Sequence, residues 1–162
     1  METQRLFLTP LDHCDNAFFI ALVNSPSWLK FIGNRNIYSA LDAQIYIQNI
    51  LDTPDYTYWT VRLKGNQTPI GVLSLIKRDY LDAHDIGFAF LPEYTNRGYA
   101  YEATHCVVEK LKRNPFYAKL YATTLAENKS SIKLLTRLGF QFVKVIHPKE
   151  EYLNLYVLRS DR

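Results

Sequence analysis

The segment Leu91-Pro-Glu-Tyr-Thr-Asn-Arg-Gly-Tyr-Ala100 joins a predicted strand, residues 84–91, to a predicted helix, residues 98–113. A glycine at such a junction lets the backbone approach a ligand closely, and the first amides of a helix have no acceptor within it. These amides and the helix dipole favour an anion such as a pyrophosphate. A plain tight turn before a helix has the same features. The spacing matches neither the Walker A loop nor the three-glycine dinucleotide motif.

Working outward, residues 84–125 form a predicted strand–helix–strand unit, which indicates two parallel strands. A further helix begins at Asn128 and is predicted to end at Gly139-Phe140, a sequence typical of a Schellman stop. The remaining strands are predicted from β-branched, aromatic or apolar runs at residues 5–8, 56–63, 69–76, 142–146 and 152–158. The pattern predicts one α/β domain over residues 1–162, with a mixed, mostly antiparallel sheet and helices on its faces.

Two helices are predicted in the first third of the chain, at residues 12–24 and 41–51. The core-facing stripe expected for the first helix is Ala17, Phe18, Ile20 and Ala21. Residues 25–34 lie between the two helices and carry large apolar side chains between Pro26 and Gly33, so they are predicted to form an aromatic loop.

Composition excludes several classes of protein. The net charge of +3 over 162 residues is too small for a dedicated nucleic-acid binder. Two cysteines are too few for a disulfide framework, and no metal-ligand spacing stands out. No apolar run approaches the length of a membrane span, and no secretory signal is visible. We therefore expect a soluble, cytoplasmic protein, either monomeric or a homodimer.

Four motifs in order resemble the GNAT N-acetyltransferases: Asp85-Ile-Gly-Phe-Ala-Phe-Leu-Pro-Glu-Tyr94, Arg97-Gly-Tyr-Ala-Tyr-Glu-Ala103, Ala122-Thr-Thr-Leu-Ala-Glu-Asn-Lys-Ser-Ser-Ile132 and Leu138-Gly-Phe140. Together with Thr3-Gln-Arg-Leu-Phe-Leu8 and Trp28-Leu-Lys-Phe-Ile-Gly33, they look most like the RimJ/RimL branch, which acetylates ribosomal-protein N-termini. The resemblance covers nearly the whole chain. It implies acetyl-CoA as acetyl donor, and a parallel strand pair that splays apart at the cofactor site.

The resemblance also implies the cofactor contacts. The pyrophosphate motif of the family begins with Arg or Gln, whereas this chain has Thr95 there, which weakens one polar contact but leaves the backbone amides. The residues expected to bind the cofactor are Ala89, Phe90, Leu91, Thr95, Asn96, Arg97, Gly98, Tyr99, Ala100, Asn128 and Ser131. Asn128 is also the expected helix N-cap.

Acetyl transfer to an amine needs a proton acceptor and a proton donor, but no covalent enzyme intermediate. Asp85 and Glu151, or its neighbour Glu150, match positions of catalytic carboxylates in the family. The alternatives are a strand-edge charge turned to solvent for Asp85, an exposed turn carboxylate for Glu151, and water as the proton acceptor. Leu135 stands where many relatives have an acidic Tyr, so Ser131 is the candidate proton donor.

The resemblance implies that residues 28–38 form a wall of the acceptor site, with Trp28 and Phe31 contacting substrate. The alternative is a hydrophobic cluster that pins this segment to the sheet. The implied reaction is acetylation of a primary amine, best a peptide or protein N-terminal α-amine. The alternative acceptor is a small-molecule amine (a polyamine, an amino sugar or an antibiotic). The alternative function for the whole protein is a non-catalytic acyl-CoA-binding module.

Overall fold

The computed structural model describes residues 1–160. Its helices are α1 (Asn16–Val23), α2 (Pro26–Phe31), α3 (Ala40–Leu51), α4 (Tyr99–Lys112) and α5 (Lys129–Arg137). Its strands are β1 (Leu6–Pro10), β2 (Tyr56–Leu63), β3 (Pro69–Lys77), β4 (His84–Phe90), β5 (Lys119–Thr124), β6 (Gln141–Ile146) and β7 (Leu153–Arg159).

The strands form one seven-stranded sheet in the order β1-β2-β3-β4-β5-β7-β6. All neighbours are antiparallel except β4 and β5, which are parallel. These two strands pair only at His84–Leu120 and Asp85–Tyr121, near their starts, and then separate. The expected mixed sheet, its single parallel pair and the splay of that pair are therefore confirmed.

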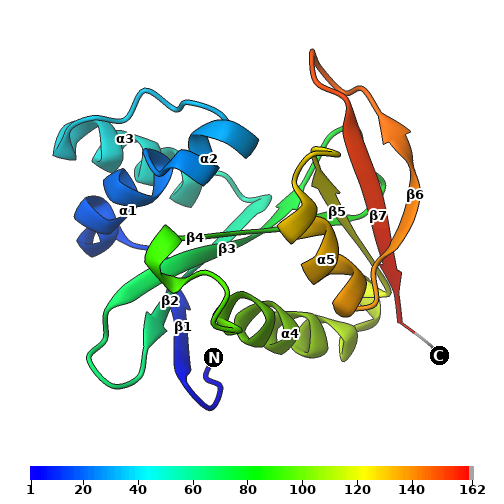
Figure 1. Ribbon diagram of the computed structural model, residues 1–162, viewed down its shortest axis with the longest axis horizontal. Coiled ribbons are helices and arrows are strands. Elements are labelled where there is room, and N and C mark those ends of the chain that lie inside the picture. The colour runs from blue at the N-terminus through cyan, green and yellow to red at the C-terminus, as the bar shows by residue number, and fades with distance from the viewer. Residues whose placement is uncertain (161–162) are drawn as a thin grey trace.

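Helices cover both faces of the sheet, as expected (Figure 1). On one face, α4 and α5 pack against a core that includes Leu73, Ile86 and Tyr156. On the other face, α1, α2 and α3 pack around Phe19 and Ile47. Burying apolar side chains on both faces is what stabilises the central strands β3 and β4.

The predicted loop at residues 25–34 is wrong, because α2 lies within it. Pro26 stands at the start of the helix, where its fixed φ and missing N–H cost nothing. The helix ends where the amides of Ile32 and Gly33 both donate to the Trp28 carbonyl, with Gly33 at a φ of +102°. A helix this short has too few turns to show an apolar period in the sequence.

The predicted stripe of the first helix is wrong for two of its four members, Ala17 and Ala21, whereas Phe18 is buried and Ile20 packs against the core. Residues 13–15 form a 3-10 turn, and α1 then buries Phe18, Phe19, Leu22 and Val23. Ala17 and Ala21 are exposed. The large side chains remove more apolar area from water than the alanines do, so they set which side of the helix faces the sheet.

Candidate active site

The loop between β4 and α4 presents a row of backbone amides. A single 3-10 turn, Pro92–Tyr94, leads into Asn96 at a φ of +59° and Gly98 at a φ of +82°. Across residues 1–160, no backbone acceptor takes a hydrogen bond from the amides of residues 96–100. Gly98 precedes α4, so these amides lie at the positive end of the helix dipole. The arrangement suits an anionic group such as a pyrophosphate.

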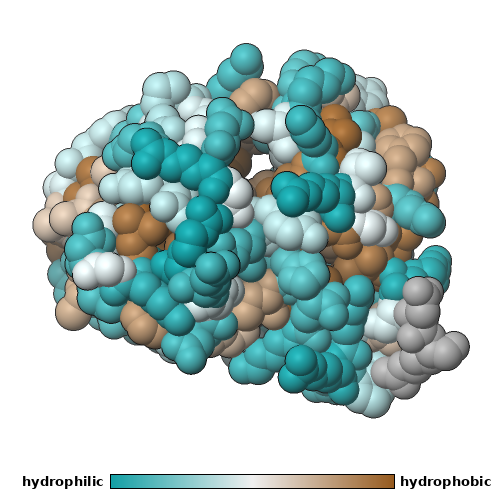
Figure 2. All heavy atoms as spheres, turned by 60° about the horizontal axis from the view of Figure 1, so that its bottom comes forward, coloured by the Kyte–Doolittle hydropathy of each residue, from teal (hydrophilic) through white to brown (hydrophobic). Residues whose placement is uncertain are grey.

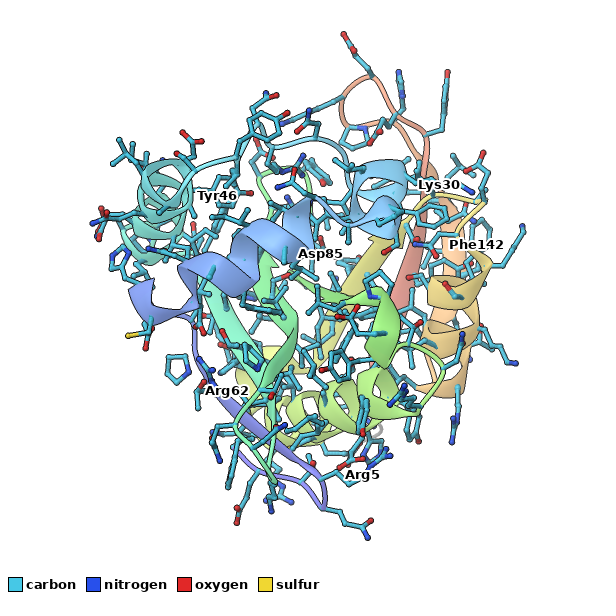
Figure 3. All side chains as sticks on the ribbon, turned by 60° about the vertical axis from the view of Figure 1, so that its left-hand side comes forward. Arg5, Lys30, Tyr46, Arg62, Asp85 and Phe142 are labelled. Atoms are coloured by element: carbon cyan, nitrogen blue, oxygen red, sulfur yellow. The ribbon has the colours of Figure 1, made fainter. Side chains whose placement is uncertain are left out.

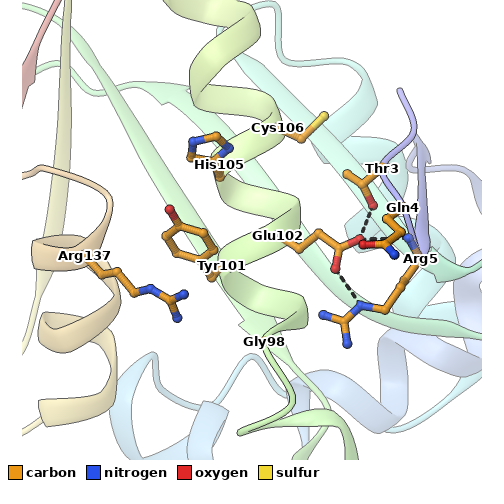
Figure 4. Close-up of a pocket in the computed structure, with 9 residues that line it drawn as sticks. All are labelled: Thr3, Gln4, Arg5, Gly98, Tyr101, Glu102, His105, Cys106 and Arg137. Atoms are coloured by element: carbon orange, nitrogen blue, oxygen red, sulfur yellow. Dashed lines mark hydrogen bonds and ion pairs between the residues drawn. The ribbon is translucent and has the colours of Figure 1, made fainter.

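Arg5 holds this loop against the start of α4 (Figure 4). Its Nη1 donates to the Arg97 carbonyl at 3.1 Å, its Nε donates to Glu102 Oε2 at 2.7 Å, and its guanidinium lies 4.4 Å from the Tyr99 ring centroid. A Cβ at Gly98 would lie 3.2 Å from Arg5 Nη2. Sequence reasoning missed Arg5 and Glu102, because they are 97 residues apart and no local pattern links them.

An open cavity of about 390 Å³ runs along the exposed side of α4 (Figure 4). Arg137 of α5 stacks on the Tyr101 ring at 4.0 Å on one side of it, and Arg5 lies on the other side. Two guanidinium groups therefore flank the first turns of α4. Glu102 compensates the charge of Arg5, so the Arg137 guanidinium is the cation of this cavity without a carboxylate partner among the described residues.

The separation of β4 from β5 opens the interior of the molecule beside this loop. Figure 2 shows an opening between the α1–α3 part of the molecule and the part formed by α5, β6 and β7. Ala89 is half-buried, and the buried Phe90 ring crosses Gly71, where a Cβ would lie 2.4 Å from the ring. The Leu91 amide donates to Ile70 O at 2.9 Å. The edge of β4 turned toward β5 is thus free beyond Asp85.

Asp85 lies where the two strands part, and its carboxylate is buried (Figure 3). Arg78 Nε donates to its Oδ2 at 3.0 Å, and its buried Oδ1 has no hydrogen-bond partner among the described residues. Burial raises the pKa of the Asp85 carboxyl to about 6, against the lowering effects of the Arg78 guanidinium and, after it, of the Thr123 amide and hydroxyl. The alternative of a charge turned to solvent is wrong. A buried carboxylate that titrates near neutral pH is suited to accept a proton.

Asn128 and Ser131 lie at the start of α5, which follows β5. Asn128 Oδ1 accepts hydrogen bonds from the Ser131 amide at 3.2 Å and from the Ser130 hydroxyl at 3.1 Å. The expected N-cap role of Asn128 is confirmed. The Ser131 side chain is half-buried.

Glu151 belongs to the loop between β6 and β7 and is exposed. Its carbonyl accepts a hydrogen bond from His147 Nδ1 at 3.0 Å, and the His147 ring stacks on Tyr152. Its side chain borders a second open cavity of about 400 Å³, together with Leu125, Ala126, Glu127, Val145, Tyr152 and Asn154. Asp85 is not part of that lining, so the two candidate carboxylates occupy different surroundings.

Trp28 points into the core beneath α2, and only 6% of its surface is exposed. Its Nε1 donates to the Gly33 carbonyl at 3.1 Å, and its ring meets Phe19 edge to face at 6.3 Å. Phe31 is half-buried beside the Lys30 ammonium, which Figure 3 labels. These contacts favour the packing alternative for Trp28.

Within residues 1–160, no helix is long and apolar enough to cross a membrane. The same residues contain no group of three His, Cys, Asp or Glu side chains placed to hold a metal ion.

Comparisons with known proteins agree with this geometry. The acetyltransferase (GNAT) domain family matches residues 5–141. The chain is 24% identical over 153 residues to the uncharacterized N-acetyltransferase YnaD of Bacillus subtilis, covering 92% of this chain and 88% of that protein. A GNAT-family acetyltransferase structure from Bacillus anthracis has a TM-score of 0.82 at 19% identity, covering 99% of this chain and 98% of that one. A spermidine N-acetyltransferase from Vibrio cholerae, solved with CoA and spermine, has a TM-score of 0.81 at 16% identity, covering 98% and 97%.

Proposed function

The chain belongs to the GNAT family and is an N-acetyltransferase, and from that premise we propose that it acetylates the α-amine of a peptide or protein N-terminus by direct transfer. The observation that carries the reaction type is the combination of three features along β4 and the loop that follows it. These are the free amides before α4, the parting of β4 from β5, and the buried Asp85 carboxylate at the point where they part. The choice of acceptor rests on the resemblance to the RimJ/RimL branch.

The residues present fit acetyl-CoA, which supplies the acetyl group as an activated thioester. The amides of residues 96–100 and the guanidinium of Arg5 would hold its phosphates, and the free edge of β4 at Ala89, Phe90 and Leu91 would lie along its pantetheine arm. The side chain of Asn128 is committed to capping α5, so its contact with the cofactor would use its remaining amide hydrogens.

Proton movement is assigned to two side chains. Asp85 Oδ1 accepts a proton from the amine as the new C–N bond forms, directly or through one water. Ser131 donates a proton to the sulfur as the C–S bond breaks, and regains one from solvent. Glu151 is exposed and lines a separate cavity, so we assign it to acceptor binding rather than to proton transfer.

A polyamine is the second candidate acceptor, because of the cavity beside β5. Two carboxylates, Glu127 and Glu151, line it together with the Tyr152 ring. Carboxylates and an aromatic face both attract ammonium groups.

The test is a thiol-release assay at saturating acetyl-CoA with two acceptors, a set of short peptides with free N-termini and a set of polyamines. We expect kcat/KM to be highest for peptides and to fall when the peptide N-terminus is blocked. The same assay with Asp85→Asn is expected to lose 10²–10⁴-fold in kcat, as is typical when a general base is removed. Preference for polyamines, with a large rise in KM for Glu151→Gln, would select the second candidate.

A further inference from the structure

We propose that Arg78 is a positioning residue for acetyl transfer, holding Asp85 by one oxygen so that the other stays available to the attacking amine. This inference rests on the proposed role of Asp85. It assigns Arg78 a function that no motif of the sequence points to.

The contact between the two side chains is one-sided. Arginine often binds a carboxylate through two parallel hydrogen bonds. Here only Nε donates, at 3.0 Å, and only to Oδ2. Oδ1 is buried and has no hydrogen bond of normal geometry within residues 1–160, and the nearby Thr123 amide and hydroxyl lower the pKa of the carboxyl without filling that position. A buried lone pair of this kind is costly unless a ligand or water satisfies it, so Oδ1 marks the direction in which a proton-bearing group is expected.

The backbone that carries Arg78 is itself fixed. Arg78 lies directly after β3, and its carbonyl accepts hydrogen bonds from the Leu81 amide at 3.2 Å and from Lys77 Nζ at 3.3 Å. Leu81 is buried, which anchors the turn. Asp85 is fixed on its two sides by pairing with Ile76 and Tyr121. Two rigid backbones therefore set the position of one carboxylate oxygen, which is what alignment with a reacting amine requires.

The exposure of the two side chains fits a positioning role better than a stability role. The Asp85 side chain is 5% exposed, whereas the Arg78 side chain is 35% exposed. Solvent can stabilise Arg78 without its partner, but the carboxylate depends on Arg78 to remain ionised in a buried site. Loss of the guanidinium therefore changes the ionisation of Asp85 more than it changes the fold.

Other titratable groups surround the pair. They are Tyr80 and Asp79 on the same loop, Tyr56 and Tyr58 on β2, Tyr121 on β5, His84 on β4 and, beyond Tyr58, Tyr46 and Arg35. Burial raises the pKa of the Tyr58 and Tyr80 phenols, so both stay neutral between pH 5 and 8. The His84 ring packs against Phe116 and Tyr117 instead of Asp85.

The experiment measures acceptor kcat/KM from pH 5 to 9 with one peptide, for the wild type, Arg78→Gln and Arg78→Lys. For Arg78→Gln we expect the acidic limb of the kcat/KM profile to shift to higher pH by at least one unit. We also expect kcat to fall at least tenfold, with unchanged CoA affinity by calorimetry. Arg78→Lys keeps the charge but lacks the Nε–H, so the limb should stay within half a pH unit while kcat falls several-fold. Asp79→Asn and His84→Gln are matched controls that should leave the limb in place.

The outcomes distinguish the role of Asp85 from the role of Arg78. If Asp85→Asn retains wild-type turnover, the proton acceptor is wrong and the inference about Arg78 fails with it. If Asp85→Asn is inactive while Arg78→Gln keeps the wild-type limb and kcat, only the inference about Arg78 is overturned. Should Arg78→Gln not fold, wild-type kcat in Arg78→Lys overturns the inference, and a several-fold loss with the limb in place supports it.

Discussion

Replacing Trp28 by alanine tests whether this residue packs the core or contacts the acceptor. The side chain is 6% exposed and meets Phe19 edge to face. Truncating a buried tryptophan typically costs about 3–5 kcal/mol. The lost hydrogen bond to the Gly33 carbonyl adds little, because Arg35 Nη1 also donates to that oxygen at 3.3 Å. For a domain with a total stability of about 5–15 kcal/mol, the expected loss is a large fraction.

The assay is urea unfolding followed by far-UV circular dichroism, since the substitution removes one of only two tryptophans and alters fluorescence. A cost of about 3–5 kcal/mol corresponds to a fall in melting temperature of about 6–20 °C for a domain of this size. Leu29→Ala is the matched control, because Leu29 is the next residue in α2 and is 42% exposed. We expect it to cost less than about 1 kcal/mol.

The kinetic measurement distinguishes the two roles of this segment. If packing is the role of Trp28, acceptor KM stays near the wild-type value in the folded fraction. Near-normal melting of Trp28→Ala together with a raised acceptor KM would refute the packing argument. Phe31, which is half-buried, remains our candidate for acceptor contact, and Phe31→Ala is expected to raise acceptor KM with little change in melting.

Three further predictions concern the cofactor and proton sites. Gly98→Val should raise the Kd of CoA, measured by calorimetry, at least tenfold, because a β-branched residue is strained at a φ of +82°. The control is Gly65→Val, which should leave this Kd unchanged because a Cβ there meets nothing within 4 Å. Between about pH 4 and 7 the native state keeps a proton on Asp85 that the unfolded chain has lost, so rising pH through this window destabilises the fold by up to about 3 kcal/mol. Urea titrations at about pH 4 and about pH 7 should show this loss of stability for the wild type and not for Asp85→Asn. Ser131→Ala should lower kcat by a larger factor than it raises the Kd of CoA, and an unchanged kcat would assign proton donation to water.

The features predictable from the sequence are those fixed by local chemistry. The amides of Gly139 and Phe140 donate to Thr136 and Leu135, which is the Schellman stop expected there. The parallel pair followed from a strand–helix–strand order, which has few topological solutions.

What the sequence could not reveal are contacts between distant segments and the direction of side chains in short helices. Arg5 contacts Glu102 because β1 lies beside α4 in the fold, and no residue spacing in the sequence predicts this ion pair. The burial of Trp28 depends on how α2 docks on α1. Asp85 could be placed on its strand from the sequence, but not its burial or its pairing with Arg78.

The candidate site lies where the strand β4 loses one of its two neighbouring strands. Beyond Asp85, β4 keeps its antiparallel partner β3 but loses β5, so its backbone N–H and C=O groups on that side have no strand to bind. Backbone polar groups in an interior opening need a partner, and an extended ligand that carries amides can supply one, as the pantetheine arm of acetyl-CoA does. Asp85 is the last residue of β4 held by strands on both sides. Its backbone is therefore fixed at the point where the free edge of β4 begins, and under the proposed mechanism this fixed backbone would align the proton acceptor with the acetyl donor.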